Sequence, residues 1–104
     1  MQKRILNAEA AKRLEAIHKL SQDYNRKLKT NHRKRLMELM KEHVDEISKL
    51  CRKNNLHYLT ETGDLIILCI ELLLEEGVSI DEMLLKCFNR YETKLPKLAK
   101  GVKG

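Results

Sequence analysis

The sequence contains few of the residues that interrupt helices. Its 104 residues include one proline and four glycines, and these two residue types mark most turns. The composition is therefore rich in helix formers and poor in helix breakers. Apolar residues form 42% of the chain and charged residues 35%. We predict an all-α fold in a single domain that spans residues 1–104.

Other absences narrow the class of protein. No apolar run reaches the roughly 20 residues of a membrane-spanning helix, and the charged N-terminus lacks the apolar segment of a secretion signal. Cys51, Cys69 and Cys87 are odd in number and lack CxxC spacing, which argues against a disulfide framework or a zinc site built from cysteines. We expect reduced cysteines in the core of a cytoplasmic protein without a membrane partner.

Positive charge is concentrated near the N-terminus. Residues 1–35 hold eleven lysines and arginines against three acidic residues, and the whole chain carries a net charge of +6. This field attracts phosphate-bearing partners, so a basic helical module that binds nucleic acid is one possible function. Only four residues are aromatic and none is tryptophan, so rings that could stack on bases are scarce. A solvated helix face explains the same charges.

Apolar residues recur at spacings of three, four and seven, which is the period of an α-helix. The predicted helices span about residues 3–28, 32–53, 60–76 and 79–95. The centre of the third, LIILCIELLL, is apolar nearly all round, so we expect it to be buried on most sides. The inward positions of the second helix are predicted to be Leu36, Met40, Val44, Ile47 and Cys51.

Four local signals set the ends of these helices. Asn31 is a cap for the second helix, Gly77 ends the third, and Ser79 with Glu82 forms a capping box for the fourth. Pro96 is expected to end the fourth helix. A chain this short buries a modest core. We therefore predict a four-helix bundle that is completed by homo-oligomerisation.

Acidic residues stand beside the apolar stripes of two helices. His43 and Glu46 are three residues apart on the second helix, and Glu61 and Asp64 are three apart at the start of the third. Carboxylates that converge near a core repel one another and are costly to desolvate. A hard divalent cation removes that cost through oxygen ligands. For either pair alone, ordinary helix charges are an adequate explanation.

These stretches resemble the all-α nucleoside triphosphate pyrophosphohydrolases of the MazG type. That family has E-E-x-x-E on one helix and E-x-x-D at the start of the next core helix. Here the first reads EHVDE over 42–46 and the second ETGD over 61–64, with fourteen residues between them. The resemblance covers about residues 39–95 and leaves 1–35 as a basic helix before the family-like core. His43 replaces the family's second glutamate.

The resemblance implies an enzyme that cleaves a nucleoside triphosphate, or a related compound, into a monophosphate and pyrophosphate. It implies a divalent cation held by His43, Glu46, Glu61 and Asp64. The cation would be Mg²⁺, with Mn²⁺ as an alternative because a histidine ligand suits Mn²⁺ or Zn²⁺ better. Glu42 and Glu46 would be the catalytic carboxylates, with Glu42 orienting the attacking water.

The resemblance also implies phosphate contacts and partners. Arg90 and Lys94, one turn apart on the last predicted helix, would bind phosphates outside the metal. Related proteins assemble as homodimers or homotetramers. Three alternatives remain: a catalytically inactive relative, because of His43; the nucleic-acid-binding module; and a phosphoribosyl-ATP pyrophosphohydrolase, whose aromatic–histidine stretch after GDL is replaced here by IILCI. The other histidines show no ligand-like spacing and are predicted at the surface: His18, His32 and His57.

Overall fold

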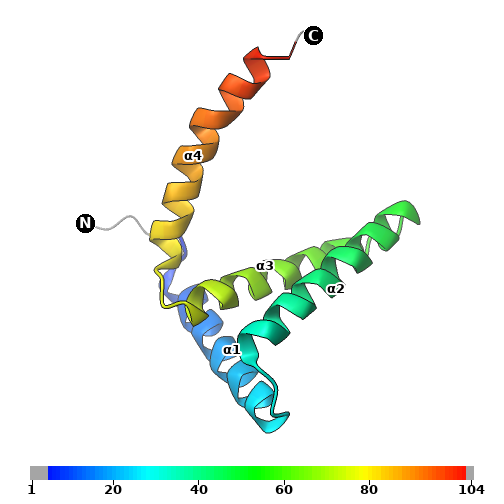
Figure 1. Cartoon of the computed structure of the whole chain (residues 1–104), viewed down its shortest axis with the longest axis vertical. Coiled ribbons are helices and arrows are strands. Elements are labelled where there is room, and N and C mark those ends of the chain that lie inside the picture. The colour runs from blue at the N-terminus through cyan, green and yellow to red at the C-terminus, as the bar shows by residue number, and fades with distance from the viewer. Residues whose placement is uncertain (1–4, 103–104) are drawn as a thin grey trace.

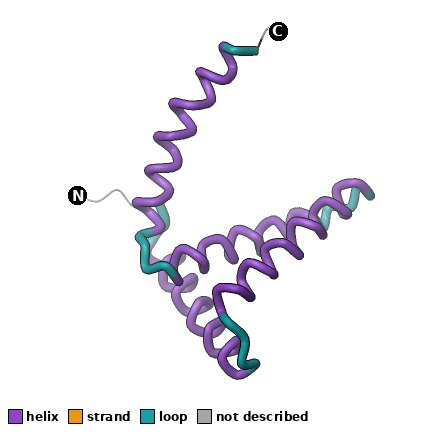
Figure 2. Tube along the Cα trace, viewed as in Figure 1, coloured by secondary structure: helices purple, strands orange, loops and turns teal. Residues whose placement is uncertain are grey.

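The computed structural model describes residues 5–102, and these residues form four helices with no strand among them (Figure 2). The helices are α1 (Ala8–Lys27), α2 (His32–Arg52), α3 (Tyr58–Glu75) and α4 (Ile80–Lys100). The all-α prediction is confirmed. The predicted start of the first helix, at residue 3, lies outside the described residues.

The packed centre is an antiparallel pair of helices, α2 and α3 (Figure 1). α1 crosses this pair at the end where α2 begins and α3 finishes, and it contacts both. Leu36 in α2 and Leu68 in α3 are the only apolar residues in the described part of the chain that are buried. The core is therefore a thin seam along α2 and α3.

α4 stands apart from the other helices. Among the described helices it contacts α3 alone, and it points away from the α2–α3 pair (Figure 1). Its first turn is tied to the segment before α1, because Asp81 Oδ1 accepts hydrogen bonds from the backbone N–H groups of Ile5 and Leu6 at 2.8 and 3.1 Å. One chain by itself thus does not close the four helices into a bundle.

Side-chain caps begin three of the four helices. Asn7 caps α1, Asn31 Oδ1 accepts from Lys34 N–H at 2.9 Å, and Ser79 Oγ accepts from Glu82 N–H at 3.3 Å. Each cap satisfies a backbone donor that has no partner within its helix. The cap predicted at Asn31 is confirmed, and so is the Ser79 hydroxyl bond of the predicted capping box.

Gly77 terminates α3 through a left-handed residue. Its φ is +71°, and its N–H donates to the Leu74 carbonyl at 3.0 Å while Val78 N–H donates to the Leu73 carbonyl at 3.3 Å. These two bonds form a Schellman motif, in which glycine is preferred because it has no Cβ. The prediction for Gly77 is confirmed.

Pro96 does not end α4, contrary to the prediction. It lies inside the helix, which continues to Lys100. The ring removes one backbone hydrogen bond and crowds the carbonyl four residues earlier, on Glu92. Both residues are exposed, so water can bond that carbonyl and the helix tolerates the proline.

Several positions predicted to be inward are exposed. Val44 is 52% exposed, and Cys51 and Cys69 are exposed while Cys87 is intermediate. The cysteines are free, as expected, but Cys51 and Cys69 are not in a core. The reason is that α4 leaves the faces that a closed bundle would cover. Within residues 5–102, no helix combines the length and the apolar character needed to cross a bilayer.

Candidate functional site

His43, near the middle of α2, faces two carboxylates at the start of α3. His43 Nε2 lies 3.5 Å from Glu61 Oε2 and 3.9 Å from Asp64 Oδ2. One possible ligand atom from each of these residues lies within 4.8 Å of the others. The antiparallel pairing of α2 and α3 therefore brings together three of the four predicted metal ligands.

The ring of His43 is oriented by its own helix. Nδ1 lies 2.8 Å from the Leu39 carbonyl oxygen, which can only accept, so Nδ1 donates the hydrogen bond. In a neutral ring the lone pair is then on Nε2, and it faces two carboxylates. This arrangement is repulsive unless a proton or a cation lies between them. The donor set, one imidazole nitrogen and two carboxylates, therefore suits a divalent cation.

The site is partly open to solvent. The exposed fractions of the His43 and Glu61 side chains are 22% and 20%, and that of Asp64 is 54%. A hollow of about 190 Å³ adjoins it and is lined by His43, Asp64, Ile67 and Leu68. A cation bound here could exchange with solvent and contact a substrate.

His57 adds a second imidazole beside Glu61. Its Nε2 lies 3.5 Å from Glu61 Oε1, and its side chain is 59% exposed. His57 is at the surface, as predicted, but it also neighbours the predicted site. The signal available in the sequence was the i,i+4 spacing of His57, the residue before α3, and Glu61 in its first turn, which places both on one side of the helix start.

The two predicted catalytic carboxylates do not join this cluster. Glu42 is exposed, and its Oε1 lies 3.8 Å from Arg35 Nη1 on the same helix. Residues adjacent in a helix point about 100° apart, which turns Glu42 away from His43. Glu46 is also exposed and is absent from the group of converging ligand atoms in the described residues. The roles of Glu42 and Glu46 remain predictions.

Arg90 and Lys94 lie on α4, away from the cluster. Both are exposed, and the Arg90 guanidinium sits 5.5 Å from the centroid of the Tyr91 ring. Because α4 does not contact α2, one chain does not place these cations beside His43. If Arg90 and Lys94 bind the phosphates of a substrate at His43, they must come from another copy of the chain.

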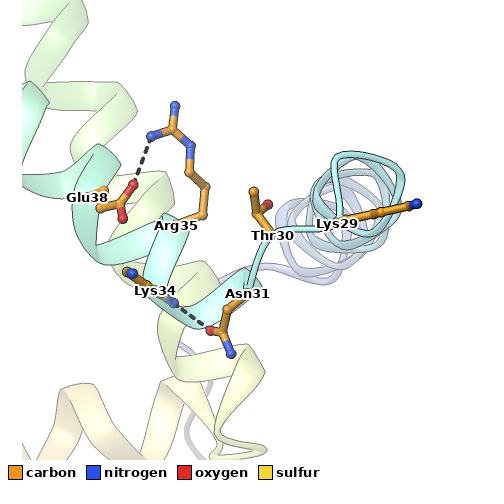
Figure 3. A pocket seen from close by; sticks show the side chains of 6 residues that line it. All are labelled: Lys29, Thr30, Asn31, Lys34, Arg35 and Glu38. Carbon is orange, nitrogen blue, oxygen red and sulfur yellow. Dashed lines mark hydrogen bonds and ion pairs between the residues drawn. The ribbon is translucent and has the colours of Figure 1, made fainter.

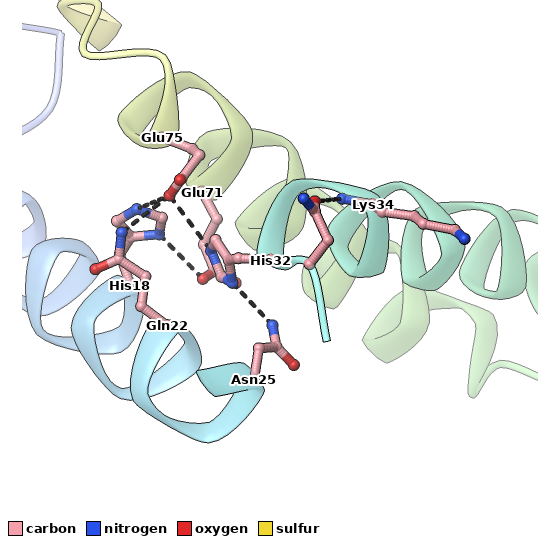
Figure 4. Close-up of polar contacts among 8 residues, drawn as sticks. His18, Gln22, Asn25, His32, Lys34, Glu71 and Glu75 are labelled. Carbon is pink, nitrogen blue, oxygen red and sulfur yellow. Dashed lines mark hydrogen bonds and ion pairs between the residues drawn. The ribbon is translucent and has the colours of Figure 1, made fainter. Parts of the chain in front are cut away.

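A second, more deeply buried cluster joins α1, α2 and α3 (Figure 4). His18 is 8% exposed and Glu71 is 3% exposed. His18 Nδ1 lies 3.3 Å from Glu71 Oε1, and His18 Nε2 lies 3.1 Å from Glu75 Oε2. His32 Nε2 lies 3.6 Å from the same Glu75 oxygen. One possible ligand atom from each of His18, His32 and Glu71 lies within 4.8 Å of the others.

Two amides support this buried cluster. Asn25, 3% exposed, has its Nδ2 2.8 Å from His32 Nδ1, and Gln22 Nε2 donates to Glu75 Oε2 at 2.9 Å. The surface prediction for His18 is wrong, and His32 is also largely covered, with 12% of its side chain exposed. Spacing within one helix cannot show residues that converge from three helices. The signal that existed was a polar row at helical spacing on α1: His18, Gln22 and Asn25.

The connection between α1 and α2 carries a basic hollow of about 290 Å³ (Figure 3). Its lining residues are Lys29, Thr30, Asn31, Lys34, Arg35 and Glu38. Arg35 pairs with Glu38 at 3.2 Å, and Arg33 close by pairs with Glu76 at 2.8 Å. These pairs offset part of the positive field that would attract nucleic-acid phosphates. The hollow therefore gives the nucleic-acid alternative no specific geometry.

Among protein-family models, curated proteins and solved structures, none matches this chain.

Proposed function

We propose that the chain is a metal-dependent hydrolase that cleaves a nucleoside triphosphate, or a related compound, into a monophosphate and pyrophosphate. The observation that carries this proposal is the convergence of His43 Nε2 with the carboxylates of Glu61 and Asp64. These residues occupy the positions in EHVDE and ETGD that the MazG-type resemblance assigns to the metal. A cytoplasmic location is part of the same proposal.

The chemistry of the donor set supports a divalent cation held by His43, Glu61 and Asp64. Two carboxylates balance the charge of a dication, and the imidazole nitrogen favours Mn²⁺ or Zn²⁺ over Mg²⁺. When bound, such an ion supplies a polarised phosphate oxygen and an acidified water. Glu46 is kept as the fourth ligand, because its exposed side chain lies about one turn from His43 on α2.

A second copy of the chain belongs to the proposal. The hollow beside His43, about 190 Å³, is smaller than the roughly 300–1,000 Å³ of typical small-molecule sites. A nucleotide therefore needs a further surface. A partner chain packed on the apolar faces of α3 and α4 would supply it and would complete the bundle. Its α4 would carry Arg90 and Lys94 toward the cation. A homodimer suffices, and a homotetramer would pair two of them.

The experiment is a pyrophosphate-release assay with Mg²⁺ and with Mn²⁺ across a panel of nucleoside triphosphates. Glu61→Gln should lower the release rate by at least about 100-fold, because it removes a charged ligand, whereas losing an outer partner of a ligand alone costs about 10- to 100-fold. The matched control is Glu15→Gln, an exposed carboxylate on α1 outside the cluster, which should leave the rate unchanged.

Two results would redirect the proposal. A wild-type chain that releases no pyrophosphate with either cation would favour the catalytically inactive relative. Binding to single-stranded or duplex nucleic acid that weakens steeply with salt, and that Glu61→Gln leaves untouched, would favour the basic module.

A further inference from the structure

The buried cluster contains two imidazole nitrogens without hydrogen bonds. His18 Nε2 and His32 Nε2 are buried, and neither makes a hydrogen bond with any residue that the structure describes. Glu75 Oε2 lies within ion-pair distance of both, at 3.1 and 3.6 Å, but forms a hydrogen bond with neither. Buried polar atoms are nearly always bonded, and an unbonded one is costly. A group that bonds both nitrogens is therefore expected here.

The distances around Glu75 fit a metal ion. Zinc bonds to nitrogen and carboxylate oxygen are about 2.0–2.2 Å, so neighbouring ligand atoms of a tetrahedral site lie about 3.3–3.5 Å apart. The separations of Glu75 Oε2 from His18 Nε2 and His32 Nε2 are 3.1 and 3.6 Å. The three side chains come from α1, α2 and α3 (Figure 4). An ion shared by Glu75 and the two rings would link these three helices.

Each Nε2 has a lone pair for a metal only if the other nitrogen of its ring carries the proton. Glu71 Oε1, 3.3 Å from His18 Nδ1, accepts that proton and leaves Nε2 for the metal, which is the usual carboxylate–histidine–metal arrangement. For His32, the Asn25 amide must present Oδ1 to Nδ1 rather than the Nδ2 now placed there. A half-turn of the amide exchanges these two atoms in place. Gln22 holds Glu75 by its hydrogen bond.

Charge and chemistry indicate the kind of ion. Two imidazoles with two carboxylates, Glu71 and Glu75, carry two negative charges and balance a dication. Imidazole ligands favour Zn²⁺ and its neighbours over Mg²⁺ or Ca²⁺. The site is separate from the one at His43: Asp64 and Glu71 are seven residues apart on α3, which is about 10 Å along the helix. The inference does not rest on the proposed function.

We propose that His18, His32 and Glu75 form a structural zinc site that fastens α1 to the α2–α3 pair, with Glu71 and Asn25 as positioning residues. The described part of the chain buries only two apolar residues. A metal site would add stability, because small domains commonly use a bound metal to compensate for a small hydrophobic core. His18 and Glu71 are buried, while Glu75, with 28% of its side chain exposed, gives an ion a route from the solvent.

The test uses the full chain, stripped by a chelator and carrying His43→Ala so that the other cluster is disabled. Zn²⁺ added at 100 times its Kd should raise the Tm by about 10 °C or more, and calorimetry should find one ion per chain. His18→Ala or His32→Ala added to this chain should weaken binding by at least about 100-fold, and Glu71→Gln by about 10- to 100-fold. The control, His57→Ala, has an exposed side chain and should not alter binding.

Because a histidine variant could fail to fold, the ion is also located directly. Zinc anomalous scattering from crystals of the wild-type chain grown with Zn²⁺ should show a peak between His18 and His32. A peak only beside His43 and Glu61, or no peak, overturns the proposal. So does a His43→Ala chain that binds no Zn²⁺, since the cluster is then a network of ion pairs without metal.

Discussion

At the scale of single residues, the seam between α2 and α3 repeats one arrangement. His43 and His32 are eleven residues apart, which is about three helical turns, so they lie on the same face of α2. Each faces a pair of carboxylates on α3. Buried Leu36 lies between the two histidines in the sequence. Burial distinguishes the clusters: Asp64 in the His43 cluster is 54% exposed, whereas His18 and Glu71 in the other are buried and Glu75 reaches the solvent.

His43→Glu tests which residues of the EHVDE stretch bind the metal. The substitution restores an oxygen ligand and a negative charge, so we expect Mg²⁺-dependent pyrophosphate release to rise by about 10-fold relative to Mn²⁺-dependent release. The two rates are measured on one preparation. Unchanged rates would indicate that Glu42 and Asp45, rather than positions 43 and 46, are the working pair of the motif.

Cys69 offers a pH-dependent probe of the α3 surface. Cys69 is exposed, but it lines an apolar hollow, and its partial burial there raises the pKa of the thiol by disfavouring the charged thiolate. Because the thiolate is the reactive form, its alkylation by iodoacetamide should reach half its maximal rate at a higher pH in the folded chain than in the urea-unfolded chain. Mass spectrometry of the Cys69 peptide gives both profiles. Coincident profiles would show that the thiol is not desolvated.

At the scale of helices, the ends are set by local chemistry. Asn31 and Ser79 are N-caps, and Gly77 forms the Schellman motif. Each signal acts within a few residues, so it can be recognised in the sequence alone. Pro96 is the exception, since its effect depends on whether the surroundings can supply a partner for the freed carbonyl.

Gly77→Ala and Gly63→Ala form a matched pair. A Cβ at either position meets no atom within 4 Å, so only backbone preference changes. At Gly77, with φ +71°, alanine should lower the free energy of unfolding by about 1–2 kcal/mol. At Gly63, inside α3, alanine should raise it by about 0.5–1 kcal/mol. Urea denaturation measures both, and changes of the same sign would contradict this account.

At the scale of the whole molecule, the single chain is open. Its radius of gyration is 16.8 Å, against about 13 Å for a compact domain of this length. An apolar hollow of about 390 Å³ lies between α3, the start of α4 and the segment before α1. The residues lining it are Leu6, Thr62, Leu65, Ile66, Cys69, Ile70, Leu73, Ile80 and Leu84. This surface is where we expect a second copy to pack.

Ile66→Lys should separate the copies without unfolding the chain. Ile66 lines the apolar hollow and is 56% exposed, so a lysine is tolerated in one chain but would bury a charge in an assembly. We expect a dimer or tetramer for the wild type and a monomer for the variant by analytical ultracentrifugation. The control is Leu20→Lys on α1, where the side chain is 69% exposed. A monomeric wild type would remove the second copy from the proposal.

Part of the candidate site was predictable and part was not. Glu61 and Asp64 were placed on one face of a helix by their spacing, and His43 by its position beside the apolar stripe of the preceding helix. The structure brings these three together. Glu46 has the same spacing from His43 yet lies outside the cluster, because the crossing of α2 and α3 decides which turn of α2 faces the carboxylates.

The sequence by itself determined the helices, their caps and the residue types that converge at His43. Those features depend on periodicity and on contacts within about four residues. Only the tertiary structure decided that His18 meets Glu71, fifty-three positions away, and that α4 leaves the other helices. The angles at which helices cross arise from packing between distant segments. They therefore cannot be predicted from the spacing of residues within one segment.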